Sequence, residues 1–357
     1  PLVAKVIWAT LAYMLWDTAY TLCDVPIFGI VTTMTLDQKE RVSLNSIGRI
    51  FAIFAGIVTG ILLPLVRQSL GGWATTVIVL SILSAAMMIP MCLFAKERVI
   101  EREKARDGGA EENYTLRDMV ECLRSNKYLL IFFAAPLISS LLNIGATWGL
   151  YIARYCLGGE EIASFVSMAV IVPTLIGAAI AVQLCKKYDK FKIFYFSYMF
   201  ALILGIVRYI AGYENMMVYV ILNALGGFPL GIAAILQYQF TPDCYEYGQY
   251  KTGLKMRGVT FAAQTFFTKL NGAIATAVSV FALTLIGFKE GEGVIQAAGF
   301  ADKLWTFSCL GSIIGGIGTL LILRLYKLND HDVQLMAKCN NGEITREEAE
   351  AQMINRY

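Results

Sequence analysis

Residues 8–26 read Trp8-Ala-Thr-Leu-Ala-Tyr-Met-Leu-Trp-Asp-Thr-Ala-Tyr-Thr-Leu-Cys-Asp-Val-Pro26. The run is almost long enough to cross a bilayer by itself, since a spanning helix needs about 20 apolar residues. Two carboxylates, Asp17 and Asp24, nevertheless interrupt it. A carboxylate at the centre of a spanning helix costs about 2.5–3.5 kcal/mol, so such residues usually face a cavity, a partner charge or a substrate. The stretch therefore predicts a membrane helix that faces a polar path.

The composition of the whole chain agrees with a membrane protein. Of 357 residues, 57% are hydrophobic and 16% are charged, and the mean hydropathy is +0.59. These values nearly exclude a soluble helical protein, and we expect an all-α polytopic membrane protein. Apolar runs predict nine spanning helices, near residues 5–33, 44–67, 73–95, 128–156, 162–185, 192–211, 215–242, 257–287 and 302–326.

Basic residues are concentrated in every second connection between these helices. The basic segments are residues 37–41, 96–127, 186–190, 243–257 and the tail after Arg324. The positive-inside rule places them in the cytoplasm. Pro1 is then on the outer side, which indicates that an odd number of helices precedes it.

We divide the chain into four parts on this basis. Residues 1–96 are the remainder of an N-terminal six-helix half, and residues 97–127 are a cytoplasmic central loop. Leu116, Met119, Val120 and Leu123 in that loop have the spacing of a short amphipathic helix. Residues 128–327 form a C-terminal six-helix half, and 328–357 a cytoplasmic tail.

Chemistry-bearing motifs are absent from the sequence. The eight cysteines stand singly, without a C-x-x-C pair or a nearby His, so we interpret them as packing residues. The one histidine, His331, lies in the polar tail, where we expect it to be solvated. There is no nucleophile motif or phosphate-binding loop. We therefore expect no enzyme, no catalytic residue and no cofactor.

A polar stripe runs along the first predicted helix. Asp17 and Asp24 are seven residues apart, so they share a face and lie about 10 Å apart along the axis. Tyr20 and Thr21 lie between them, and Phe28 follows one turn later. Carboxylates and aromatic rings on one stripe suit a sugar, whose hydroxyls need acceptors and whose C–H face can stack. The alternative is a buried helix with acids paired to basic neighbours.

Basic residues also occur inside predicted helices. Arg49 and Lys269 lie well within theirs, and intramembrane charges commonly mark transport paths. Arg154 and Arg208 lie nearer to helix ends, where we expect their side chains to snorkel towards the interface.

Two separated groups of motifs resemble the glycoside-pentoside-hexuronide:cation symporters, the family of melibiose permease. The motifs are Tyr20-Thr-Leu-Cys-Asp-Val-Pro-Ile-Phe28, Thr35-Leu-Asp-Gln-Lys-Glu-Arg41, Arg49 with Phe51 and Gly56, Asp243-Cys-Tyr-Glu-Tyr-Gly248, Lys251-Thr-Gly253 and Gln264-Thr-Phe-Phe-Thr-Lys269. The family belongs to the major facilitator superfamily, with twelve helices in two halves around a central site. The resemblance implies that this chain holds helices four to twelve, nine of the twelve.

The resemblance also implies roles for individual residues. With Asp17 added from its spacing, the expected substrate-binding residues are Trp16, Asp17, Tyr20, Asp24, Phe28, Arg49, Thr265 and Lys269. Cation coupling is expected at Thr21, Asp24 and Lys269. A cytoplasmic gating network of charges is expected at Arg41, Asp243, Glu246 and Lys255. Asp189 departs from the pattern, because relatives commonly have Gly there.

The expected function is cation-coupled symport of a glycoside, pentoside or hexuronide by alternating access. The coupling ion is Na⁺ or H⁺, with Li⁺ as a further candidate, and we expect no metal beyond a transported Na⁺. We expect a monomer in the inner (plasma) membrane that binds a small sugar and a monovalent cation, but no nucleic acid. The alternatives are a carrier of a lysolipid or another organic solute on the same fold, and a membrane sensor without turnover.

Overall fold

The structure is a computed structural model, and every described element in it is helical. It describes residues 2–34, 40, 43–44, 47–48, 50–52, 54–56, 73–95, 116–142, 145, 147–159, 161–255, 257–289 and 295–357. The chain forms two compact units, residues 1–114 and 115–357, each of which is described by itself. The boundary between them lies within the predicted central loop.

The first unit contains two long helices. They are α1, Leu2–Met34, and α3, Trp73–Phe94, and both include a proline, Pro26 and Pro90. At 33 residues, α1 is about 50 Å long, more than the roughly 30 Å of a bilayer core. The predicted helices 5–33 and 73–95 are thus confirmed. Of the predicted helix 44–67, the residues described up to Gly56 are helical, and 57–67 lie outside the described residues.

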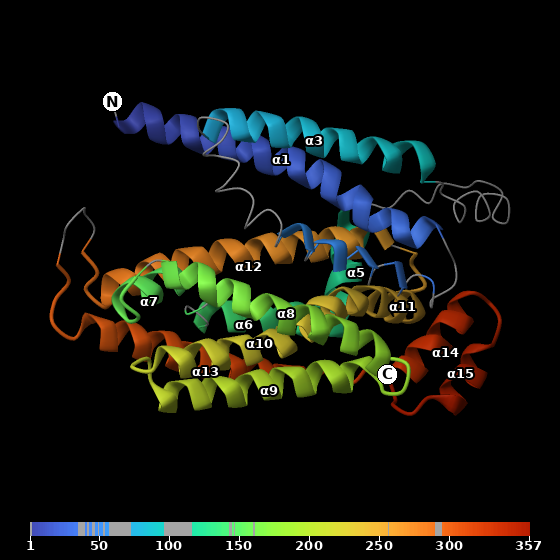
Figure 1. Cartoon of the computed structure of the whole chain (residues 1–357). Coiled ribbons are helices and arrows are strands. Elements are labelled where there is room, and N and C mark those ends of the chain that lie inside the picture. The colour runs from blue at the N-terminus through green and yellow to red at the C-terminus, as the bar shows by residue number, and fades with distance from the viewer. Residues whose placement is uncertain are drawn as a thin grey trace. The chain divides into compact units, whose positions relative to one another are not determined.

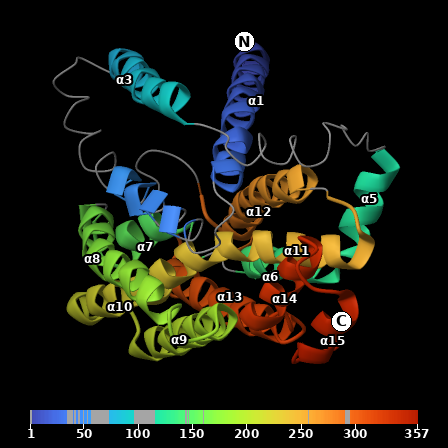
Figure 2. The same ribbon diagram turned by 90° about the vertical axis from the view of Figure 1, so that its right-hand side faces the viewer.

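The second unit is a bundle of apolar helices with a small helical tail (Figures 1 and 2). Its helices are α5 (Leu116–Ser125), α6 (Lys127–Leu142), α7 (Gly149–Tyr155), α8 (Glu161–Leu184), α9 (Lys190–Ala211), α10 (Met216–Leu236), α11 (Phe240–Thr252), α12 (Arg257–Leu285), α13 (Phe300–Leu323), α14 (Asp330–Asn340) and α15 (Arg346–Gln352). Helix α8 packs along α10, and α13 packs along α6. Helix α9 joins the two pairs because it contacts both α10 and α13, while α12 packs on α6.

The predicted helix 128–156 was wrong as a single element. It is broken into α6 and α7, with Trp148 between them and completely buried. The Trp148 indole Nε1 donates a hydrogen bond to the Ser279 carbonyl of α12 at 3.3 Å. Burying this large ring, with its polar atom satisfied, stabilises the break in the helix.

The predicted loop from Asp243 was also wrong, because residues 243–252 belong to helix α11. A short 3₁₀ turn, Gln237–Gln239, joins α10 directly to α11. Helix α11 ends at Gly253, whose φ of 75° lies in the left-handed region and whose N–H bonds the Gln249 carbonyl. Glycine is the residue that adopts this conformation without strain, which explains the glycine of the Lys251-Thr-Gly253 motif.

Two aromatic-rich cores stabilise the second unit. The tail-end core lies under α14 and includes Tyr128, Phe132, Phe194, Phe240, Tyr326 and Met336. The far-end core includes Trp148, Tyr219, Leu283, Phe300, Leu304 and Trp305. Since α9 begins at the first core and α13 begins at the second, the two cores mark opposite ends of the bundle.

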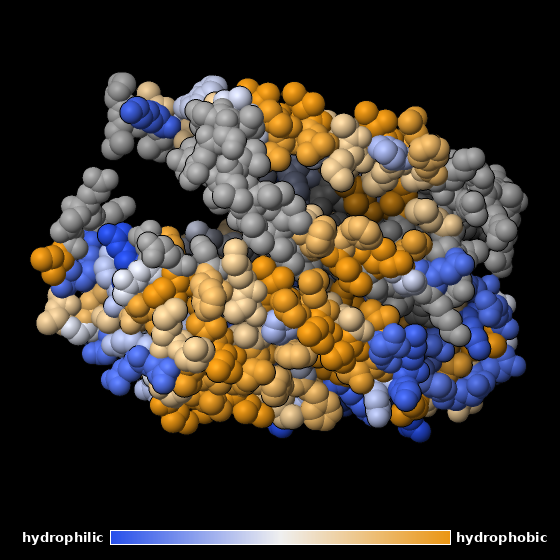
Figure 3. Space-filling view, viewed as in Figure 1, coloured by the Kyte–Doolittle hydropathy of each residue, from blue (hydrophilic) through white to orange (hydrophobic). Residues whose placement is uncertain are grey.

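The flank of the bundle is apolar, as expected for a surface that faces lipid. Within the described residues, six helices are long and apolar enough to span a membrane, and Lys127–Leu142 is apolar but shorter. Large side chains such as Phe196, Ile203 and Ile210 of α9 are exposed. Figure 3 shows apolar residues over the middle of the bundle and hydrophilic residues gathered at its ends. The protein is an all-α polytopic membrane protein.

Candidate functional site

The predicted stripe on α1 combines a carboxylate with stacked aromatic rings. Asp17 lies near the middle of the helix and is half-buried. The Trp16 and Tyr20 rings stack with centroids 5.8 Å apart, and the Tyr13 ring lies 5.7 Å from that of Trp16. The Thr21 hydroxyl donates to the Asp17 carbonyl at 2.7 Å. This helix therefore presents an acceptor beside two flat apolar faces, the arrangement that suits a polyol.

Two further predicted substrate-binding residues lie on α12. Thr265 and Lys269 are one helical turn apart, so they share a face, and both are half-buried. The Thr265 hydroxyl bonds weakly to the Phe261 carbonyl of its own helix, at 3.4 Å. Close by in sequence, Asn271 accepts a short hydrogen bond from Ser140 of α6. This bond fixes the middle of α12 against α6 and so holds these residues in place.

Four of the predicted site residues are not fully described. Asp24 and Phe28 belong to α1, but their side chains lie outside the described part. Arg41 and Arg49 lie outside it altogether. Their predicted roles stay predictions, as do the roles of the described residues on α1 and α12.

At the tail end of the bundle, the predicted gating residue Asp243 forms a buried charge cluster. Its carboxylate lies 2.6 Å from the Lys190 ammonium, and only 3% of Asp243 is exposed. Asp330 of the tail contacts the same ammonium at 3.1 Å. One lysine thus joins α9, α11 and α14. A buried lysine is expensive to keep charged unless it is paired in this way.

The sequence did not single out Lys190 or Asp330 as partners of Asp243. Lys190 stands in a basic run at a helix start, where it could not be distinguished from a topology signal. Asp189 caps α9, because its side chain accepts from the Phe191 amide at 2.9 Å and the Lys192 amide at 3.3 Å. The departure from glycine at this position therefore has a structural reason.

The other two predicted gating residues lie apart from this cluster. Glu246 accepts a hydrogen bond from the Asn340 side-chain amide of α14 at 2.9 Å. Lys255 is exposed and follows the end of α11. Helix α11 is therefore attached to the tail by Asp243, through Lys190, and by Glu246. The Tyr250 hydroxyl adds a third contact, because it donates to Glu350 of α15 at 3.0 Å.

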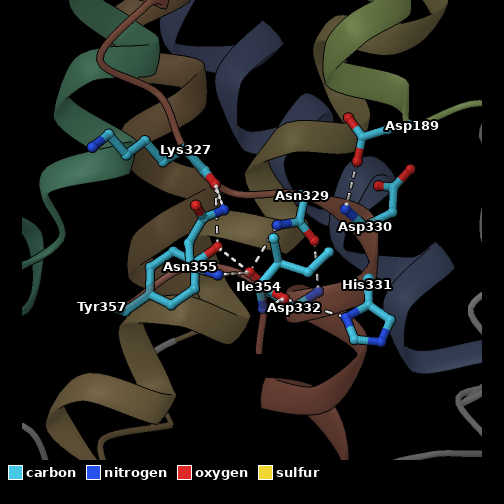
Figure 4. Close-up of polar contacts among 9 residues, drawn as sticks. All are labelled: Asp189, Lys327, Asn329, Asp330, His331, Asp332, Ile354, Asn355 and Tyr357. Carbon is cyan, nitrogen blue, oxygen red and sulfur yellow. Dashed lines mark hydrogen bonds and ion pairs between the residues drawn. The ribbon is translucent and has the colours of Figure 1, made fainter. Parts of the chain in front are cut away.

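The tail itself is held by a group of contacts that we call the tail clasp (Figure 4). The Asp332 carboxylate is completely buried and accepts from the Ile354 amide (2.8 Å), the Asn355 amide (3.1 Å), the Tyr357 hydroxyl (2.7 Å) and the Asn329 side chain (2.7 Å). The Asn355 side-chain amide also donates to the Lys327 carbonyl at 3.1 Å, and the Tyr357 hydroxyl oxygen lies 3.1 Å from the same carbonyl. The clasp therefore ties the end of the chain to the exit from α13.

Protonation of Asp332 is governed by two opposing effects. Burial raises the pKa of its carboxyl, but the hydrogen bonds from Ile354, Tyr357, Asn355 and Asn329 outweigh burial and leave the pKa below its ordinary value. His331 contacts the same carboxylate at 3.3 Å, although 54% of its side chain is exposed. The clasp thus contains a carboxylate that stays ionised at neutral pH.

Comparison with known proteins decides the family. The profile of the family described as MFS/sugar transport protein matches residues 1–330. The chain belongs to this family. Most of α14 and all of α15 lie beyond the matched residues, so Asp332, Ile354, Asn355 and Tyr357 of the tail clasp lie outside what the family profile covers.

Several curated proteins are similar over most of the chain. The putative glycoside/cation symporter YagG of Escherichia coli K12 is 25% identical, over 94% of this chain and 72% of its own length. The isoprimeverose transporter of Lactiplantibacillus pentosus is 22% identical, over 93% of this chain and 70% of its own. The lactose permease of Lactobacillus helveticus is 25% identical, over 88% of this chain and 48% of its own.

In the part of the chain that the structure describes, no group of three His, Cys, Asp or Glu side chains could hold a metal ion. The polar groups that are present, carboxylates beside rings and a lysine beside a threonine, are suited to hydrogen bonding of a neutral or charged solute.

Proposed function

We propose that this protein is a secondary active carrier that couples downhill movement of a cation to uptake of a glycoside, pentoside or hexuronide. The single observation that supports this most is the α1 stripe, where half-buried Asp17 lies beside the Trp16–Tyr20 stack in a helix that the sequence predicts to span the membrane. The family match over residues 1–330 and the names of the relatives support the same class of activity.

The mechanism is alternating access around a site near the middle of the membrane. Binding of cation and sugar together favours the states that interconvert, and the gradient supplies about 2.3 kcal/mol per charge per 100 mV. The side chains that hydrogen-bond the sugar or respond to the cation are those of Asp17, Asp24, Tyr20 and Lys269. The ring of Trp16 covers the apolar face of the sugar. Na⁺ and H⁺ are the first coupling ions to test, followed by Li⁺.

We place the protein in the inner (plasma) membrane, with the tail and the central loop in the cytoplasm. The distribution of basic residues supports this orientation. The Lys190–Asp243–Asp330 cluster then lies at the cytoplasmic end, where closing and opening of the carrier would rearrange charges.

Uptake by the complete natural protein in proteoliposomes tests the proposal. Labelled galactosides, glucosides, pentosides, glucuronides and a lysolipid are offered with and without an inward Na⁺ or H⁺ gradient. We expect gradient-dependent accumulation of one sugar, and its loss in Asp17→Asn, Asp24→Asn and Lys269→Gln. Thr18→Val is the matched control, because Thr18 is exposed and its hydroxyl bonds only the Met14 carbonyl of its own helix, at 2.7 Å.

Two outcomes would contradict symport of a sugar. Accumulation of the lysolipid alone would replace the substrate class. Sugar binding without accumulation under any gradient would indicate a sensor rather than a carrier.

A further inference from the structure

A large cavity lies inside the second unit, among α6, α7, α8, α9, α10 and α13. Its volume is about 730 Å³, which is within the range of about 300–1,000 Å³ that is typical of ligand pockets. The cavity belongs to one helical bundle and does not involve the predicted substrate-binding residues on α1 and α12. Its walls are largely apolar, with Leu150, Val166, Leu222 and Ile313 among them.

One cationic side chain lines this cavity, that of Arg208 on α9. Arg208 is 18 residues after Lys190, about 27 Å along the helix from the tail end. Its guanidinium lies over the Trp305 ring, 5.9 Å from the centroid, and donates to the Asn223 side chain at 3.3 Å. The residue is half-buried, with its Nε buried.

No carboxylate forms an ion pair with Arg208 among the residues that the structure describes. Asp302 lies near the same end of α13, but its carboxylate accepts a hydrogen bond from the Tyr213 hydroxyl instead. A guanidinium in an apolar bundle is costly without an acceptor for its protons. The cavity therefore contains a positive charge that the described chain itself does not neutralise.

Hydrogen-bond donors without acceptors gather around Arg208. Four buried side-chain atoms have no partner in the described part of the chain, and three of them are Arg208 Nε, Trp305 Nε1 and Ser308 Oγ. Trp305 and Ser308 are three residues apart on α13, so they share a face, and both are at least nine-tenths buried. Of these three residues only Arg208 lines the cavity, and the Trp305 ring lies against its guanidinium. Buried polar groups normally have partners, so the Arg208 Nε indicates a place for an acceptor in the cavity.

We infer that this cavity binds one oxyanion group, with Arg208 as the charged anchor. A phosphate or carboxylate has several acceptor oxygens and the charge that guanidinium prefers. The apolar walls would contact the rest of an amphiphilic anion. The source is either an anionic lipid or a free anion. The site is separate from the proposed sugar site, so either can exist without the other.

Thermal unfolding of the complete natural protein in detergent tests the inference. The probes are inorganic phosphate, compared with chloride at equal ionic strength, and phosphatidylglycerol added to the micelles. We expect at least one probe to raise the unfolding temperature in a saturable way. Arg208→Gln should weaken binding about 10- to 100-fold, the equivalent of one charge-assisted hydrogen bond. Stabilisation by phosphate indicates a free anion, and stabilisation by phosphatidylglycerol alone indicates a lipid.

Two further variants distinguish loss of binding from misfolding of the protein. Trp305→Phe keeps a ring against the Arg208 guanidinium, so it should weaken binding less than Arg208→Gln does. Arg154→Gln is the matched control, since Arg154 also stacks on a ring, that of Tyr155, at 5.5 Å, but does not line the cavity. Absence of saturable stabilisation by either probe overturns the inference, as does equal binding by wild type, Arg208→Gln and Trp305→Phe. Sugar uptake is measured separately and does not enter this result.

Discussion

Replacing Asp332 by Asn is expected to open the tail clasp. The Oδ2 atom of Asp332 accepts from Asn329, Asn355 and Tyr357, while Oδ1 accepts from the Ile354 amide. An asparagine has only one acceptor atom. Even if it keeps the three contacts of Oδ2, its NH₂ group must then face the Ile354 amide, donor against donor.

The cost follows from these contacts. One donor is left unsatisfied, at about 1–3 kcal/mol, and three charge-assisted bonds become ordinary ones. Residues released from the clasp can bind water, so we expect the substitution to lower the free energy of local opening by about 3 kcal/mol. This corresponds to an open population on the order of 100-fold larger. Tyr357→Phe removes one hydroxyl, so its effect should be smaller, about 10-fold.

Trypsin cleavage after Lys327 measures the open population. In the clasp, Asn355 and Tyr357 bind the Lys327 carbonyl, and Leu328 is only 2% exposed. When the clasp recloses faster than trypsin cuts, the cleavage rate follows the open fraction. Mass spectrometry of the released fragment 328–357 should show that cleavage is fastest in Asp332→Asn, slower in Tyr357→Phe and slowest in wild type.

A control variant on the same tail tests whether the loss of a negative charge is by itself enough to accelerate cleavage. Glu347→Gln changes an exposed carboxylate of α15, so its cleavage should match that of wild type. The reasoning is refuted if Asp332→Asn is cleaved at the wild-type rate, or if Glu347→Gln accelerates cleavage as much.

The clasp should also respond to acid, with a definite sign. The pKa of Asp332 in the folded protein lies below its ordinary value. Its contribution to stability is therefore complete above the unfolded pKa of about 3.9 and is lost as the pH falls through the lower folded pKa. Amide exchange of residues 354–357, corrected for the intrinsic effect of pH, should be constant from about pH 8 to 5 and rise only below about pH 4.

Two substitutions in the bundle have paired controls. Lys190→Met leaves Asp243 buried without a cation and should lower the free energy of unfolding by about 3–5 kcal/mol. Asp243→Asn should lower it less, because Lys190 still has Asp330 as a partner at 3.1 Å. Equal losses of stability in thermal unfolding would argue against the cluster. In Gly231→Ala the new Cβ would collide with the Thr174 carbonyl and the Ala178 amide of α8, so the unfolding temperature should fall by several degrees. In Gly226→Ala the new Cβ would have no atom within 4 Å, so this variant should unfold at the wild-type temperature. Equal unfolding temperatures for the two glycine variants would exclude close α8–α10 packing.

Much of the fold follows from the sequence alone. In hydrocarbon a chain must satisfy its backbone hydrogen bonds internally, so long apolar runs can only be helices. The ends predicted for α1, α3, α8, α9 and α13 accordingly agree with the structure to within a few residues. The amphipathic α5 was predicted because Leu116, Met119, Val120 and Leu123 share one face. The polar stripe on α1 was also visible in the sequence, because spacing along one helix fixes which residues share a face.

What the sequence could not decide depends on residues far apart in the chain. The break before α7 exists because Trp148 reaches Ser279, 131 residues away. The partner of Asp243 is Lys190, 53 residues earlier, and Asp332 binds residues of the chain's end that follow it by 22 to 25 positions. Arg208 could equally have reached the membrane surface, and only the packing of α9 against α10 and α13 directs it to Asn223, Trp305 and a cavity. The physical reason is that hydropathy and periodicity act within one helix, whereas pairing of buried charges and the location of cavities are set by which helices pack together.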